Sequence, residues 1–245
     1  MRGFRIIALI ESEGPCDNRR MSELIDIRDE NGAHPVLVIC PKCGQPGFMD
    51  AWPWIVSTRD EHATKLLLGG DLFKYQCPVC EKTTTIVYDC MYHDVQHRCL
   101  ALFSTGKYSE EQCCESLDKF ADHAQWDSGS QTPAYQRRLV FAPFEFCEKA
   151  RIWEQGYDDR VIELMKVALK RGMLREGIIG AQDTMVYERT VDDGGISFIV
   201  FGEIPGDVVG VPRGYEFLEK HLQASASQIQ DEYRFDSAWA NRFLP

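Results

Sequence analysis

Two short stretches, CPKCG at residues 40–44 and CPVCE at residues 77–81, decide what can be inferred about the fold of this chain. Each stretch places two thiols three residues apart in a tight turn, so that both sulfurs can face one ion. Proline fixes the backbone after the first cysteine, and Gly44 allows the positive φ that turns backbone N–H groups toward the sulfurs. The two turns together supply the full tetrahedral shell of one structural Zn²⁺ ion. The predicted ligands are Cys40, Cys43, Cys77 and Cys80.

The long interval between the two pairs does not argue against this site. The 33 residues that separate Cys43 from Cys77 exceed the usual spacing in zinc ribbons, but the entropic cost of closing a loop rises only slowly with its length. The alternative interpretation is a redox dithiol, which a single Cys-x-x-Cys would leave open. Two pairs that both begin Cys-Pro, flanked by predicted strands, favour the metal. Because Glu81 stands where such turns usually have glycine, we expect the second turn to be slightly distorted.

The composition and net charge of the chain limit the classes of partner that it can bind. The 245 residues include 27 basic and 38 acidic side chains, for a net charge of -11, and the isoelectric point is near 5.0. This balance argues against a broad basic face for duplex DNA or for an anionic membrane. Residues 36–100 carry six basic and seven acidic side chains, so any contact with nucleic acid would be local to that segment.

The start of the chain and the remaining cysteines predict a cytoplasmic protein. The apolar run in MRGFRIIALIESEG is too short and too charged for a signal peptide, and no stretch approaches the length of a membrane span. The other cysteines sit singly or adjacent among apolar residues, as reduced thiols do. They are Cys16, Cys90, Cys99, Cys113, Cys114 and Cys147.

Short strands and one helix are predicted around the cysteine pairs. Residues 4–10, HPVLVIC, LFKYQ, TTTIVYDC and RCLALF are expected to be strands, and a helix is expected around Met21–Arg28. If the segment after the first pair is extended, Phe48, Trp52 and Trp54 share one of its faces. DEHATKLLLGG should form a short helix that ends in a left-handed cap at Gly69 or Gly70.

Longer helices are predicted in the second half. A helix from Ser109 to about Trp126 begins with a capping box that Ser109 forms with Gln112. After the loop SGSQTP at 128–133 comes a strand, RLVFA, and then two helices that meet near Gly156. A hairpin is expected for residues 184–190 and 196–201, and a last helix for about 215–233.

The second of the two helices that meet near Gly156 has a predicted apolar face. It is expected to stop at Gly172 and to expose Asp158. The residues expected on the buried face are Val161, Leu164, Met165 and Ala168.

Beyond the cysteines, the chain resembles the CpXC domain family, bacterial proteins named for two Cys-Pro-x-Cys motifs. LLLGGDLFKYQCPVC, MYHD at 91–94 and FCEKARIWEQGYDDRVIELMK at 146–166 are similar to the later blocks of that family, in the same order. The resemblance covers about residues 36–220. It implies the fold and the zinc, and it implies no established biochemical activity.

We therefore predict an α+β fold, a split four-cysteine zinc ribbon continued by mixed β-strands with about four helices packed on them. Residues 1–35 would be an N-terminal extension. Residues 36–104 would form the zinc-ribbon portion with an inserted hairpin and helix, and residues 105–245 an α+β portion packed on the ribbon as one compact unit.

A second set of side chains forms the alternative, catalytic hypothesis. Its members are His93, Asp94, Asp159 and Glu163. Asp159 and Glu163 are four residues apart on one helix face, where they could join His93 in an acid–base or divalent-metal site. His93 and His97 have the spacing of a metalloprotease pair, but their segment lies between strands and lacks the glutamate of HExxH.

The plainer interpretation gives these residues no chemistry. His93 and Asp94 would hydrogen-bond strand ends to a neighbouring helix. The carboxylates of residues 148–163 would form a solvated helix face, with those at 158 and 159 complementing the helix dipole. These carboxylates are Glu148, Glu154, Asp158, Asp159 and Glu163.

A third hypothesis concerns aromatic residues beside lysines, which can stack single-stranded bases. The set is Phe48, Trp52, Trp54 and Tyr75 with Lys42, Lys74 and Lys82. Burial of these aromatic side chains in a core or an interface is the favoured alternative.

The favoured function is a non-enzymatic zinc-binding scaffold that recognises another protein. A four-thiolate shell has no open position for water or substrate, so the metal would stabilise the fold and not catalyse. Duplex DNA and membranes are excluded as partners, and homo-oligomerisation is compatible with the sequence. The sequence names neither the biological process nor the partner.

Overall fold

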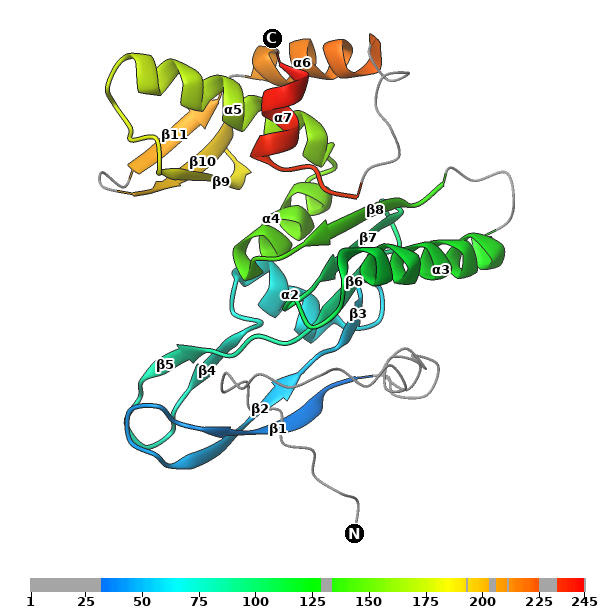
Figure 1. The fold of residues 1–245 in the computed structure, drawn as a ribbon, viewed down its shortest axis with the longest axis vertical. Helices are drawn as coiled ribbons and strands as arrows, with labels where there is room; N and C mark the ends of the chain where they lie inside the picture. Colours follow the sequence, from blue (N-terminus) through cyan, green and yellow to red (C-terminus); the bar gives the residue numbers. More distant parts are fainter. Residues whose placement is uncertain are drawn as a thin grey trace.

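The computed structural model describes residues 32–128, 134–192, 194–202, 206–210, 212–224 and 233–244. The strand expected at 4–10, the helix expected around Met21–Arg28, Cys16 and most of the loop at 128–133 lie outside these ranges. Figure 1 shows two small hairpins at one end, a sheet flanked by helices in the middle, and a second sheet with helices at the other end. The α+β class is confirmed, with six helices in the described residues where the sequence predicted about four.

The two hairpins carry the cysteine pairs. β1 (His34–Ile39) and β2 (Pro46–Ala51) are antiparallel on either side of the first pair, and β4 (Lys74–Gln76) and β5 (Thr83–Thr85) flank the second. Between the pairs the chain does not form a hairpin of its own. β2 pairs with β1, while β3 (Trp54–Val56) pairs with a strand that follows both pairs.

A four-stranded sheet forms the middle of the molecule. Its order is β3-β6-β7-β8, with β6 (Cys90–Asp94) antiparallel to β7 (Cys99–Phe103) and β8 (Gln136–Val140) parallel to β7. One face packs against α3 (Glu110–Ser128) through a core that includes Met91, Leu100 and Leu117. The other face packs against α2 (Glu61–Gly69) and α4 (Pro143–Glu154).

Two helix ends in this region form as predicted. The hydroxyl of Ser109 accepts from the backbone N–H of Gln112 at 3.3 Å, and the side chain of Gln112 accepts from the N–H of Ser109 at 3.1 Å. This reciprocal pair is the predicted capping box. Gly70 ends α2 with φ 75°, which confirms the left-handed cap.

The far end of the molecule contains α5 (Asp159–Arg175), a three-stranded antiparallel sheet and two more helices. The sheet has β9 (Thr184–Thr190), β10 (Ile196–Phe201) and β11 (Gly206–Gly210), and the hairpin of β9 and β10 is the predicted one. α6 (Pro212–Ala224) and α7 (Ser237–Phe243) pack on α5. The sequence did not predict α7, and the part of the expected last helix beyond residue 224 lies largely outside the described ranges.

The predicted stop of α5 at Gly172 is wrong. The helix continues to Arg175, and the left-handed glycine after it is Gly177, with φ 68°. The N–H of Ile178 then donates to the carbonyl of Met173 at 2.9 Å, as in a Schellman end. A glycine inside a helix costs only about 1 kcal/mol relative to alanine. Packing on both sides of α5 outweighs this cost, so the helix continues beyond Gly172.

The buried face of α5 is wider than predicted. Val161, Leu164 and Met165 are buried as expected, but Ala168 is exposed. Two residues that the prediction omitted, Ile162 and Val167, are buried instead. Asp158 is partly buried and not exposed, because it caps the helix by accepting from the N–H of Arg160.

Leu164→Ala should lower the free energy of unfolding by about 2–5 kcal/mol, because Leu164 is 0% exposed and the truncation leaves a cavity. Denaturant titration followed by circular dichroism measures this change. Leu174→Ala is the matched control on the same helix, since Leu174 is 37% exposed and should shift stability by less than about 1 kcal/mol. Equal effects of the two changes would contradict the assigned face.

The described cysteines outside the two pairs carry free thiols, in agreement with the sequence. They are Cys90, Cys99, Cys113, Cys114 and Cys147. Within the described ranges, no helix combines the length and the apolar character that crossing a membrane requires.

Candidate metal centre

The four cysteines of the two hairpins converge on one point. The sulfurs of Cys40 and Cys80 are 3.6 Å apart, as are those of Cys43 and Cys77, and all four lie within 4.8 Å of one another. In a tetrahedron with Zn–S bonds of about 2.3 Å, the sulfurs are about 3.8 Å apart. The cluster therefore has the size of a tetrahedral thiolate site. In the described part of the chain, no other group of three or more His, Cys, Asp or Glu side chains has such a geometry.

The two cysteine turns have the same backbone geometry. The N–H of Gly44 donates to the carbonyl of Cys40, and the N–H of Glu81 donates to the carbonyl of Cys77, each at 2.9 Å. Gly44 has φ 71° and Glu81 has φ 58°. The expected distortion of the second turn is therefore absent, because Glu81 adopts the left-handed conformation at a steric cost of about 1–2 kcal/mol.

Backbone N–H groups of the turns favour thiolates. The N–H of Cys43 lowers the pKa of Cys40, and the N–H of Cys80 lowers the pKa of Cys77 to about 6. The N–H of Gln45 acts in the same direction on Cys43, but burial and the neighbouring sulfurs outweigh it and raise the pKa of Cys43 to about 12. A divalent cation bound by the sulfurs would favour the thiolate form of its ligands, Cys43 included.

The side chain of Tyr75 packs against the cysteine cluster. Tyr75 is 3% exposed and packs with Val38, Cys40 and Cys77 in a small core that is separate from the rest of the molecule. Its buried hydroxyl has no hydrogen-bond partner of good geometry in the described residues. Burial raises the pKa of Tyr75, and the sulfur of Cys77 raises it further. A buried, unpartnered hydroxyl beside four sulfurs fits a site that gains negative charge when a metal binds.

The residues of the catalytic hypothesis do not form one site. The imidazole Nε2 of His93 lies 3.0 Å from the hydroxyl of Tyr135. Asp94 accepts from the backbone N–H of His97 at 3.0 Å and lies 2.8 Å from its ring Nδ1. Asp94 and His97 thus stabilise the turn between β6 and β7, and Tyr135 lies just before β8. The partners are therefore a turn and the start of a strand, and not the neighbouring helix that the plainer interpretation expected. Within the described ranges, no hydrogen bond or ion pair joins His93 or Asp94 to Asp159 or Glu163.

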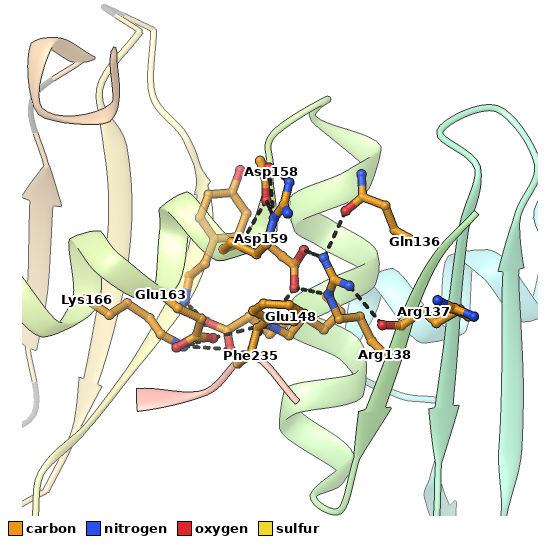
Figure 2. A network of polar contacts seen from close by, with 12 residues as sticks. Gln136, Arg137, Arg138, Glu148, Asp158, Asp159, Glu163, Lys166 and Phe235 are labelled. Carbon is orange, nitrogen blue, oxygen red and sulfur yellow. Dashed lines mark hydrogen bonds and ion pairs between the residues drawn. The ribbon is translucent and has the colours of Figure 1, made fainter. Parts of the chain in front are cut away.

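Asp159 and Glu163 belong instead to a buried network of ion pairs, shown in Figure 2. Arg138 on β8 donates twice to Asp159, at 2.7 Å each time. Lys149 on α4 lies 2.9 Å from Asp159 and 3.3 Å from Glu163. Lys166 then joins Glu163, at 2.8 Å, to Glu148, at 2.9 Å.

The solvated-face interpretation is therefore wrong for three of the five carboxylates. Asp159, Glu148 and Glu163 are 0%, 1% and 3% exposed. Only Glu154 is fully on the surface, and Asp158 is the cap of α5. Buried carboxylates need charged or hydrogen-bonding partners, and basic side chains of the network provide them here.

The basic partners of these carboxylates were missed by sequence reasoning. They are Arg138 and Lys149, which are buried, and Lys166, which is partly buried. A usable signal was the position of Glu148 and Lys149 in FCEKARIW, between the apolar pairs Phe146–Cys147 and Ile152–Trp153.

The network joins the middle of the molecule to its far end. Lys149 also donates to the backbone carbonyl of Phe235 at 2.9 Å, so β8, α4, α5 and the segment before α7 meet at one cluster of charges. Although burial alone would raise it, Arg138 and Lys149 hold the pKa of Asp159 well below its usual range. A cavity of about 490 Å³ lies beside the network. Four of the charged residues that line this cavity, Glu148, Lys149, Glu163 and Lys166, pair with one another in the network.

The aromatic residues do not form a stacking surface. Trp52 and Pro53 separate β2 from β3, so the prediction that Phe48, Trp52 and Trp54 share one face is wrong. Trp54 packs against Phe120 of α3 with ring centroids 5.6 Å apart. The backbone N–H of Trp52 donates to the hydroxyl of Tyr88. Only Phe48 among them is exposed.

A comparison with protein families found one match. The family model described as CpXC protein matches residues 38–166, more than half of the 245 residues. The matched part contains the four cysteines and ends inside α5 at Lys166, so it includes every ion-pair residue of the buried network. No curated protein and no solved structure matches the chain.

Proposed function

Because the chain belongs to the CpXC protein family, we propose that it is a zinc-binding scaffold whose two cysteine hairpins bind another protein. Cys40, Cys43, Cys77 and Cys80 would hold one zinc ion, since the spacing of their sulfurs suits that ion. Zinc in a closed thiolate shell supplies structural cross-linking and no reaction. The function therefore depends on what the hairpins present to solvent.

The observation that carries this proposal is an apolar outer face on the β1–β2 hairpin. Side chains alternate along a strand, so Val36 and Val38 point inward. Leu37 and Ile39 lie on the opposite face, and Leu37 is in register with Phe48 of β2. Ile39 is 57% exposed and Phe48 is 61% exposed. We call Leu37, Ile39 and Phe48 the outer face.

The hairpin also offers backbone groups to a partner. Among the described residues, β1 and β2 form a sheet of two strands only, so each strand has one edge without a neighbour. A free edge beside exposed apolar side chains is what an extended peptide uses when it adds a strand to a sheet. The segment 36–100 is almost neutral, which favours an apolar protein segment over an anionic nucleic acid.

Photo-crosslinking in cells that express the full chain tests this proposal. A photoreactive amino acid at position 48 should yield a discrete adduct with a partner protein. The same label at position 65 of α2 is the matched control, because Lys65 is also exposed but lies away from the outer face. Equal adducts at the two positions, or adducts with nucleic acid alone, would contradict the proposal.

Ile39→Lys should reduce the adduct formed at position 48 by more than tenfold. A charge in the centre of an apolar contact removes a hot spot worth about 2 kcal/mol or more, and 1.4 kcal/mol corresponds to tenfold in Kd. Because Ile39 is exposed, the same change should leave the zinc content and the melting temperature unchanged. A reduced adduct together with lost zinc would point to unfolding and not to a binding surface.

A further inference from the structure

The hydroxyl of Tyr75 lies in a small apolar core, where a polar group without a hydrogen-bond partner is unfavourable. It is buried among Val38, Cys40 and Cys77 and finds no hydrogen-bond partner of good geometry in the described residues. An unpartnered buried hydroxyl costs free energy that phenylalanine would avoid. Two of the cysteines of the candidate metal centre, Cys40 and Cys77, belong to the same small core and pack with Tyr75 in it.

The backbone opposite makes room for this hydroxyl. Gly47 lies on β2, in register with Val38 of β1. A Cβ added at Gly47 would overlap the hydroxyl oxygen and would lie 3.0 Å from the ring carbon that bears it. The φ of Gly47 is not positive, so backbone conformation does not require glycine there. Gly47 therefore serves to admit the tyrosine hydroxyl.

The negative charge of a metal bound by four thiolates would explain why a hydrogen-bond donor lies in this core. Four thiolates around one divalent cation carry a net charge of about -2, which is costly in a buried position unless hydrogen-bond donors surround the sulfurs. The cysteine turns supply backbone N–H donors, such as that of Cys80 to the sulfur of Cys77. Tyr75 lies on β4, outside the turns and two residues before Cys77, with which it packs.

We propose that Tyr75 is a positioning residue of the metal centre, and that its hydroxyl donates a hydrogen bond to the metal-bound thiolate of Cys77 in a space kept open by Gly47. This inference rests on the metal binding proposed above. The phenol remains protonated throughout, and no bond other than the hydrogen bond forms. Its effect is to stabilise the charged cluster and to fix the orientation of the Cys77 sulfur.

Tyr75→Phe tests the hydrogen bond while keeping the ring that packs in the core. Competition with a chelating dye should show zinc affinity about tenfold weaker than in the unchanged protein, as for other losses of a partner to a metal ligand. With Co²⁺ as the probe, the sulfur-to-cobalt charge-transfer band should move to lower energy, because the sulfur lone pair loses its donor. A purely structural role of the ring would move neither quantity.

Two further variants make the test specific. Tyr88→Phe removes the hydroxyl of another partly buried tyrosine, which accepts from the backbone N–H of Trp52, and it should leave the affinity and the cobalt spectrum unchanged. Gly47→Ala should weaken zinc binding when Tyr75 is present, and should weaken it less in a chain that already carries Tyr75→Phe, since the clash with the hydroxyl is then absent.

The outcomes separate this inference from the proposal on which it rests. If the unchanged protein binds one zinc and Tyr75→Phe has the same affinity and the same cobalt spectrum, the hydrogen bond is wrong and the zinc scaffold stands. If elemental analysis finds that the unchanged protein binds no zinc or cobalt, both are wrong. Equal effects of Tyr75→Phe and Tyr88→Phe would also overturn the inference, because the loss of zinc affinity would then follow from removing any tyrosine hydroxyl in this part of the protein.

Discussion

Cys77→Ser is expected to abolish zinc binding and to unfold both cysteine hairpins. Zinc binding to small structural sites is worth about 10–16 kcal/mol, and that energy is folding energy. The hairpins have little else to hold them, because their core contains only a few buried side chains and an isolated two-stranded hairpin is marginal in water. Elemental analysis should show zinc falling from one per chain to none. Hydrogen exchange should lose protection in residues 34–51 and 74–85 while α5 keeps it.

Two controls distinguish loss of a ligand from general damage. Cys113→Ser changes a buried thiol on α3 that lies outside the cluster, so zinc should stay at one per chain. His93→Ala should also retain the metal, because His93 pairs with Tyr135. X-ray absorption should show sulfur ligands alone. Full zinc content in Cys77→Ser, or nitrogen in the coordination shell, would contradict the four-cysteine site.

Asp159→Asn is expected to destabilise the protein by about 3–5 kcal/mol, although the side chain keeps its shape. Asp159 is 0% exposed and lies between Arg138 and Lys149. Removing its charge leaves the buried guanidinium of Arg138 without a carboxylate partner and leaves Lys149 with Glu163 alone, and breaking a buried pair in this way costs that amount. Denaturant titration measures the change. Glu61→Gln, which removes one partner of an exposed ion pair with Lys65, should have little effect.

The same substitution should change how stability depends on pH. The pKa of Asp159 is lower in the folded protein than in the unfolded chain. Its contribution is therefore complete above the unfolded pKa, near 4, and is lost as the pH falls below that value. In Asp159→Asn the decrease in stability below about pH 4 should be shallower than in the unchanged protein. Parallel curves for the two proteins would show that Asp159 is not the titrating group.

The features that the sequence predicted well depend on neighbouring residues. The cysteine turns need only proline and a residue with positive φ. The capping box of Ser109 and Gln112 spans three residues, and the left-handed end of α2 needs only Gly70. In each case the partners of the interaction are adjacent in the chain, so a local pattern contains the whole interaction.

The features that were wrong depend on distant contacts. Glu148, Asp159 and Glu163 have the spacing of a solvated helix face, and they are buried because Arg138 comes from β8 and Lys149 from α4. No sequence pattern within α5 indicates that Arg138 and Lys149 are its ion-pair partners. The two faces of α5 are likewise covered by elements from different parts of the chain, so a single apolar stripe underestimates what is buried.

The separation of the two cysteine pairs has a consequence for synthesis of the chain. Cys40 leaves the ribosome 37 residues before Cys77, an interval of roughly 2–7 seconds at about 5–20 residues per second. During that time the first pair is a half-site with two ligands, and its thiols lie close enough to oxidise to each other. An oxidant that joins Cys40 to Cys43 would remove half of the shell before the other half exists. If the four cysteines bind a metal as proposed, the nascent chain, more than the finished protein, is where that binding would most easily be lost.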